Sequence, residues 1–230
     1  MFDYTHQYQM QLLINDRTLA DEYDHTDGNT YVEARPGSEY SLMFRNNSFE
    51  RIAVVPAIDG LSVIDGQPAG IDSPSYIIAG GGTLTIPGWS KSAKEVARFV
   101  FWDKNNSYAA QTGNGTQNTG VIGALVFRES PPSFSTTPMF AGISSDSSST
   151  RSFNASASTQ DAGTGHGRFE EYNTTKVAFS KRDPKHPDAQ IVLYYDTGKS
   201  LERRGITLRY KQGYAPDPFP TAPSYLKNTR

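Results

Sequence analysis

The sequence predicts an all-β protein: an antiparallel β-sandwich of jelly-roll-like form, with a long serine-rich arm and an extended C-terminal tail. Short runs of residues alternate between apolar and polar side chains, which is the period of a half-buried strand. Turn-forming pairs such as Asp59-Gly60 and Pro87-Gly88 separate these runs. Helix signals are confined to two short segments. Closely spaced strands joined by such turns are typical of sandwiches.

Three of the alternating runs identify side chains that we expect in the core. They are residues 39–46 (EYSLMFRN), 97–103 (ARFVFWD) and 190–196 (QIVLYYD). Successive side chains of a strand point to opposite faces, so every second residue shares one environment. The predicted core-facing residues are Tyr40, Leu42, Phe44, Ala97, Phe99, Phe101, Ile191, Leu193 and Tyr195.

The segment AVVPAIDGLSVIDG predicts a hairpin. One strand runs from Ile52 to Ile58, Asp59-Gly60 supplies the positive φ angles of the turn, and Leu61 to Ile64 forms the returning strand. Pro56 has no N–H to donate to a neighbouring strand. We therefore expect this strand to lie at a sheet edge or to carry a bulge.

Both tryptophans lie in the aromatic-rich stretch PGWSKSAKEVARFVFW. Trp89 follows a Pro-Gly turn, where an aromatic ring often closes the end of a core. Trp102 lies on the face opposite Phe99 and Phe101. Buried aromatic residues are more common than exposed binding platforms, so the composition favours a core.

The two helix signals flank different strands. Ser90 has the side chain of an N-cap and predicts one short helical turn through Glu95. GKSLERRG predicts another, which ends at Gly205.

Composition divides the chain into four parts. Residues 1–130 form the sandwich domain, and residues 131–167 form a serine- and glycine-rich arm or long loop with three prolines and ten serines. Residues 168–210 return to the sandwich through strands at TTKVAFSK and AQIVLYYD and a short helix. Residues 211–230 form an extended, proline-rich tail.

Composition also excludes several classes of function. The chain of 230 residues has no cysteine, which excludes disulfides and cysteine-ligated zinc or iron–sulfur sites. Its formal net charge of −2 provides no long-range attraction to nucleic acids or anionic membranes. The N-terminus does not have the pattern of a secretory signal, and no run of apolar residues is long enough to cross a bilayer. We expect synthesis in a host cytoplasm.

No motif indicates catalysis, a metal site or a cofactor. Gly198-Lys199-Ser200 resembles the end of a phosphate-binding loop, but Leu193 stands where the first glycine of that loop is needed. The histidines are far apart in sequence and show no zinc-binding spacing. They are His6, His25, His166 and His186. We therefore expect a protein that is not an enzyme and has no cofactor.

The run from Tyr40 to Phe127 resembles a family of uncharacterised β-sandwich proteins encoded by Gram-negative bacteria and viruses. The resemblance is carried by RIAVVPAIDGLSVIDGQPAG, SYIIAGGGTLTIPGWSKSAKEVARFVF, SYAAQTGNGTQNTGVIGALVF, and the later GTGHG and VLYYDTGKSLERRGI. His166 departs from the aromatic residue expected in the GTGHG motif. The resemblance implies no activity. It implies a virion structural role, such as a capsid decoration or cement, penton or fibre-base protein of a bacteriophage.

On this hypothesis the protein assembles with copies of itself and with other virion proteins. Scattered apolar side chains in the arm and tail are suited to fill pockets on a partner. These partner-binding candidates are Phe134, Met139, Phe140, Phe153, Phe219 and Tyr225. The alternative is a carbohydrate-binding bacterial module that uses Trp89, Trp102 and nearby tyrosines. An enzyme is the third possibility.

Overall fold

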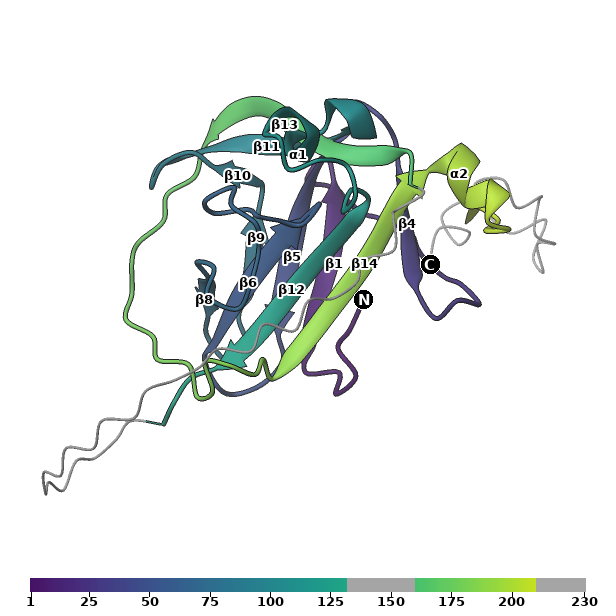
Figure 1. Ribbon diagram of the computed structural model, residues 1–230. Coiled ribbons are helices and arrows are strands. Elements are labelled where there is room, and N and C mark those ends of the chain that lie inside the picture. Colours follow the sequence, from purple (N-terminus) through teal and green to yellow (C-terminus); the bar gives the residue numbers. More distant parts are fainter. Residues whose placement is uncertain (132–159, 210–230) are drawn as a thin grey trace, which may run out of the picture.

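The computed structural model describes residues 1–131 and 160–209, and these residues form two β-sheets that pack face to face (Figure 1). Within them, each sheet has seven strands, and helix is limited to three short elements. The predicted all-β sandwich is confirmed.

The first sheet has the strand order β10-β11-β5-β1-β2, with β13 paired to β11 and β9 paired to β5. All its pairs are antiparallel. Its strands are β1 (Tyr8–Ile14), β2 (Thr18–Leu19), β5 (Glu39–Asn46), β9 (Thr83–Ile86), β10 (Gly88–Ser90), β11 (Glu95–Asp103) and β13 (Ala162–Glu171).

The second sheet has the order β3-β4-β14-β12-β6-β7, with β8 paired to β6. The pair between β14 and β4 is parallel, and the other pairs are antiparallel. Its strands are β3 (Glu22–Asp24), β4 (Thr30–Ala34), β6 (Ile52–Ile58), β7 (Leu61–Ser62), β8 (Tyr76–Ile78), β12 (Val121–Arg128) and β14 (Ala189–Thr197).

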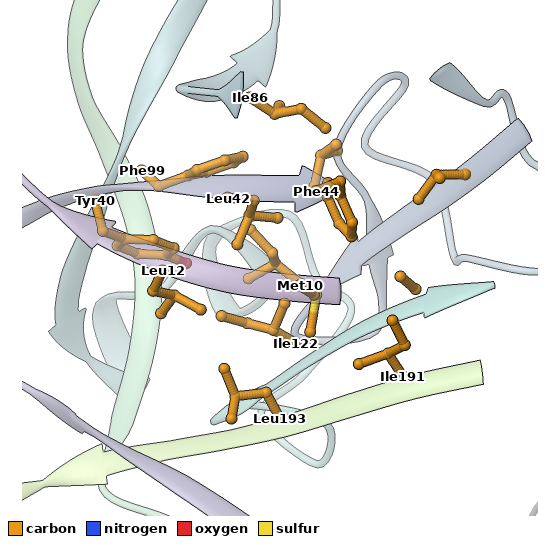
Figure 2. Packing of buried hydrophobic residues seen from close by; sticks show 14 of the residues in the cluster. Met10, Leu12, Tyr40, Leu42, Phe44, Ile86, Phe99, Ile122, Ile191 and Leu193 are labelled. Carbon is orange, nitrogen blue, oxygen red and sulfur yellow. The ribbon is translucent and has the colours of Figure 1, made fainter. Parts of the chain in front are cut away.

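The core lies between the sheets, and the predicted alternation places its side chains correctly. The nine core-facing residues expected from the three alternating runs are each at most 2% exposed. Figure 2 shows Met10, Leu12 and Tyr40 of the first sheet opposite Ile122 and Leu193 of the second. Burial of these apolar side chains is the main force that holds the two sheets together.

The predicted hairpin is present, but its details differ. Asp59 and Gly60 have φ angles of 54° and 81°, as the turn requires. The returning strand β7 is only two residues long. The expectation that Pro56 marks an edge or a bulge was wrong, because β6 pairs with β12 in continuous register. On its other side β6 pairs with β8 through residues 52–54 and with β7 through residues 57–58. Pro56 lies in the gap between these partners, where no strand needs its N–H.

Three further predictions concern the elements around the core. Helix α2 (Gly198–Arg203) is present, and Gly205 follows it with a φ of 86°, as expected. The helical turn predicted from Ser90 to Glu95 was wrong, because a bend joins β10 directly to β11 there. The strand predicted at TTKVAFSK was also wrong. Its residues cross the side of the sandwich without pairing, except for a single bridge between Lys181 and Glu129.

The predicted arm does not extend to residue 167, because β13 begins at Ala162 and pairs with β11 along its length. Gly163 and Gly165 belong to this strand and have extended backbone. Gly163 is needed because it has no side chain: a Cβ at this position would lie 2.6 Å from the Cβ of Ser107. The 3₁₀ turn η1 (Lys104–Asn106) and the helix α1 (Tyr108–Gln111) therefore pack closely against β13.

Candidate functional site

A buried hydrogen-bonded chain connects the two sheets. The Asp59 carboxylate accepts hydrogen bonds from the Tyr195 hydroxyl (2.6 Å), the Thr164 N–H (2.8 Å) and the Gly120 N–H (2.9 Å). The Thr164 hydroxyl lies 2.7 Å from the hydroxyls of both Tyr195 and Tyr40. Tyr195 and the turn that holds Asp59 belong to the second sheet, and Thr164 and Tyr40 belong to the first. The chain therefore fixes the relative position of the sheets.

Burial raises the pKa of Asp59 to about 7, although Tyr195 and two backbone N–H groups donate to its carboxylate. Burial also raises the pKa values of the Tyr40 and Tyr195 hydroxyls well above their ordinary value. None of these groups reaches solvent, because Asp59 is 3% exposed and both tyrosines are fully buried. A buried chain without access for a substrate is structural, so it is not the functional site.

A second cluster lies where β10 meets β13 and α1. Trp89 is 2% exposed and donates through Nε1 to the Gly165 carbonyl at 3.3 Å. The rings of Tyr108 and His166 lie 4.1 Å apart beside it, and the Lys91 Nζ is 3.2 Å from the His166 Nε2. Burial and the Lys91 ammonium together lower the pKa of His166 to about 4. A neutral imidazole that accepts a hydrogen bond from Lys91 closes the edge of the core here.

An ionic cluster covers the outer face of the first sheet. The Arg98 side chain is 1% exposed, and its guanidinium forms ion pairs with Asp16 (2.6 Å), Glu39 (3.3 Å) and Glu170 (3.3 Å). Arg168 pairs with the same two glutamates. A neighbouring hollow of about 540 Å³ is lined by further charged groups, of which Arg35 pairs with Glu33 and Asp21 with Arg209. Most of the charged side chains that line it thus have an ionic partner, which makes this hollow a weaker candidate for a charged ligand.

A smaller hollow of about 360 Å³ combines an exposed aromatic ring with charged side chains. Trp102, at the end of β11, lines it with 45% of its surface exposed. Pro36, from the turn before β5, provides a second apolar wall. Polar and charged side chains from η1, the start of β13 and α2 complete the lining: Asp103, Lys104, Asn105, Asp161, Lys199 and Arg203. We take this hollow, called the Trp102 hollow below, as the candidate binding site.

The structure separates the two tryptophans of the sequence. Trp89 is part of the core, as expected, and Trp102 lies on the opposite face of the first sheet. A platform that uses both rings is therefore contradicted. The alternation of residues along β11 predicted the exposure of Trp102, because it placed this side chain on the face opposite Phe99 and Phe101. The polar partners of Trp102 come from distant segments and could not be read from the sequence.

The six partner-binding candidates of the arm and tail lie outside the described residues: Phe134, Met139, Phe140, Phe153, Phe219 and Tyr225. Within residues 1–131 and 160–209, no group of three or more His, Asp or Glu side chains has the geometry of a metal site. No helix in the same ranges is long and apolar enough to cross a membrane.

Comparisons with known proteins identify no relative. No family model, no curated protein and no solved structure matches the chain.

Proposed function

We propose that this protein is a structural subunit of a viral particle, a capsid decoration or cement, penton or fibre-base protein of a bacteriophage. It acts by assembly with copies of itself and with other virion proteins. The resemblance in sequence to a family with viral members motivates the proposal. The observation that supports it best is the length of the segment that connects the two ends of strand β12.

The described chain stops at Pro131, just beyond the end of β12, and resumes at Gln160, beside the start of the same strand. Gln160 is placed there by its contact with Gly120, where a Cβ would lie 2.6 Å from the Gln160 Oε1. β12 has eight residues, so its first and last residues are ~24 Å apart at about 3.4 Å per residue. A segment as long as residues 132–159 can span ~90 Å when extended. The connection is several times longer than the distance that it must cross.

The composition of this connection supports a role in contacting partners. It is rich in serine and carries four large apolar side chains at three places along its length: Phe134, Met139 with Phe140, and Phe153. Each is able to fill one pocket on a neighbouring subunit. Several weak contacts along one chain add to a strong attachment, because the first contact raises the effective concentration of the others.

The test replaces these four side chains with serine and leaves the length of the chain unchanged. Residues from Gln160 onward stay intact, because β13 begins at Ala162 and Thr164 belongs to the buried hydrogen-bonded chain. The matched control is Phe49→Ser, since Phe49 is a fully exposed aromatic residue at the turn between β5 and β6. Circular dichroism and thermal unfolding verify that both variants are folded.

We expect the fourfold serine variant to fold normally and to be lost from purified particles, and the Phe49→Ser control to be incorporated at the parental level. Incorporation of the fourfold variant at parental occupancy would refute the proposed role of the arm.

A further inference from the structure

The Trp102 hollow presents an aromatic face that the fold leaves uncovered. Trp102 pairs across the strands with Gly163, and Gly165 is its next neighbour on β13. A Cβ at Gly165 would lie 3.7 Å from the Cβ of Trp102, so any longer side chain there would pack against the indole. Gly165 on the neighbouring strand thus leaves the indole uncovered on that side. Pro36 faces the same hollow as a second apolar surface.

The charges around the hollow are only partly neutralised. Arg203 is held by Asp161 at 2.6 Å, and the same carboxylate oxygen accepts a 2.7 Å hydrogen bond from Ser200. Neither Lys104 nor Lys199 makes a direct ion pair with a described residue, although the Lys104 ammonium is close enough to Asp161 to help lower the pKa of that carboxyl. The lining therefore has three cationic and two anionic side chains, and two of its cations are available to a ligand.

The hollow also offers hydrogen-bond acceptors. One oxygen of Asp103 accepts the Asn105 N–H at 2.9 Å, and this bond caps η1. The other Asp103 oxygen makes no hydrogen bond to the described residues. The side-chain amide of Asn105 lies on the same rim and both donates and accepts. Carboxylate and amide oxygens of this kind bind hydroxyl groups.

We propose that the Trp102 hollow binds an acidic saccharide that carries one carboxylate, of the uronic acid class. The C–H face of a pyranose ring packs on the exposed indole, because polarised C–H groups are attracted to the negative face of an aromatic ring. Lys104 or Lys199 pairs with the sugar carboxylate, and Asp103 and Asn105 accept its hydroxyl protons. The volume of about 360 Å³ is at the small end of the range for ligand pockets, which suits one or two sugar rings.

The charge balance favours a singly charged ligand. Three cationic and two anionic side chains leave a formal charge of +1 around the hollow. A nucleotide or polyphosphate would bring two or more negative charges close to Asp103 and Asp161 and would be repelled by them. A neutral sugar would leave both lysines unpaired. This binding site is independent of the proposed assembly role, because it lies entirely on the sandwich.

The purified full-length chain allows a direct test, because it has only two tryptophans and Trp89 is buried. Ligand that stacks on Trp102 changes the fluorescence of that residue alone. A glucuronate-containing tetrasaccharide is titrated and compared with its neutral glucose counterpart, with adenosine monophosphate and with inorganic phosphate. Calorimetry measures the same affinities without an optical signal. The variants are Trp102→Ala and Lys199→Ala, and the control is Lys176→Ala, since Lys176 is exposed outside the hollow.

We expect the acidic saccharide to bind with a Kd on the order of 0.1 to 1 mM, as one ring contact and one ion pair allow. Trp102→Ala should abolish binding, Lys199→Ala should weaken it by about tenfold, and Lys176→Ala should leave it unchanged. All variants should stay folded, with unfolding temperatures within a few degrees of the parent. The proposal is overturned if the neutral saccharide binds equally well, if adenosine monophosphate or phosphate binds more tightly, or if Trp102→Ala binds like the parent.

Discussion

The Tyr195 hydroxyl donates a 2.6 Å hydrogen bond to the Asp59 carboxylate in the interior of the sandwich. Thr164 joins the same pair through its N–H to Asp59 and its hydroxyl to Tyr195. A strand of the first sheet is thereby linked to a turn and a strand of the second. The link is polar, buried and sensitive to the charge of a single carboxyl group.

The first prediction concerns this carboxyl group and pH. The pKa of Asp59 is about 7 in the folded protein and near its ordinary value of 3.8 in the unfolded chain. Folding therefore favours the protonated form. Asp59 contributes stability that is fully present below about pH 4 and is lost as pH rises to about 7, at about 1.4 kcal/mol per pKa unit. Above pH 7 the loss is complete and constant.

The measurement is urea unfolding of the parent and of Asp59→Asn at several pH values. Asparagine tolerates the positive φ of this position and does not ionise. The free energy of unfolding of the parent, minus that of the variant, should fall by a few kcal/mol between about pH 4 and 7. A difference that stays constant over this range would show that Asp59 has an ordinary pKa.

The second prediction separates the two faces of β11. Phe101 is fully buried and its ring stacks on Tyr40 at 4.2 Å, so Phe101→Ala should cost about 3 to 5 kcal/mol. Trp102, the next residue, is 45% exposed, and Trp102→Ala should cost less than about 1 kcal/mol. Denaturant midpoints of the two variants test the strand register. Equal losses of stability would contradict it.

The third prediction concerns the buried guanidinium of Arg98. Arg98→Met removes the only cation that pairs with Asp16 among the described residues and leaves Glu39 and Glu170 with Arg168 alone. Unfolding free energy should fall by about 1 to 3 kcal/mol, because the carboxylates lose a partner but remain partly exposed to water. The pKa of Asp16, which Arg98 and Ser41 lower against the effect of burial, should rise in this variant. Carboxyl chemical shifts across a pH titration measure it, and an unchanged pKa would contradict the pairing.

The fourth prediction compares two glycines of β13. A Cβ at Gly163 would lie 2.6 Å from the Ser107 Cβ, and a Cβ at Gly165 meets nothing closer than 3.7 Å. Gly163→Ala should therefore destabilise the protein by about 1 to 3 kcal/mol, and Gly165→Ala should be close to neutral. Thermal unfolding of the two variants provides the comparison. A larger loss for Gly165→Ala would mean that η1 does not pack on β13 in this way.

The sequence predicted the parts of the fold that depend on local pattern. Alternation along β11 identified Phe99 and Phe101 as core residues because strand geometry alone decides which side chains share a face. The turn at Asp59-Gly60 was predicted for the same reason, since the positive φ angles depend on these two residues only.

Other features depend on contacts between distant segments and were not predictable in this way. Asp59 serves both as a turn residue and as the acceptor for Tyr195, which lies 136 positions away. Arg98 alternates with the core residues of β11, yet it is 1% exposed because Asp16 and Glu170 of other elements cover it. The sequence alone does not show why GTGHG has alternating glycines. Their use as small residues became visible only when η1 was placed against β13.

The central proposal, that the protein is a virion subunit, is tested most directly by the composition of the particles themselves. Particles from a producing culture are purified on a density gradient and washed in high salt, and the copies of this chain per shell protein are counted by quantitative peptide mass spectrometry. We predict a fixed ratio that is the same in independent preparations and survives the wash. Absence of the chain from the particles, or a ratio that falls toward zero on washing, would contradict the proposal.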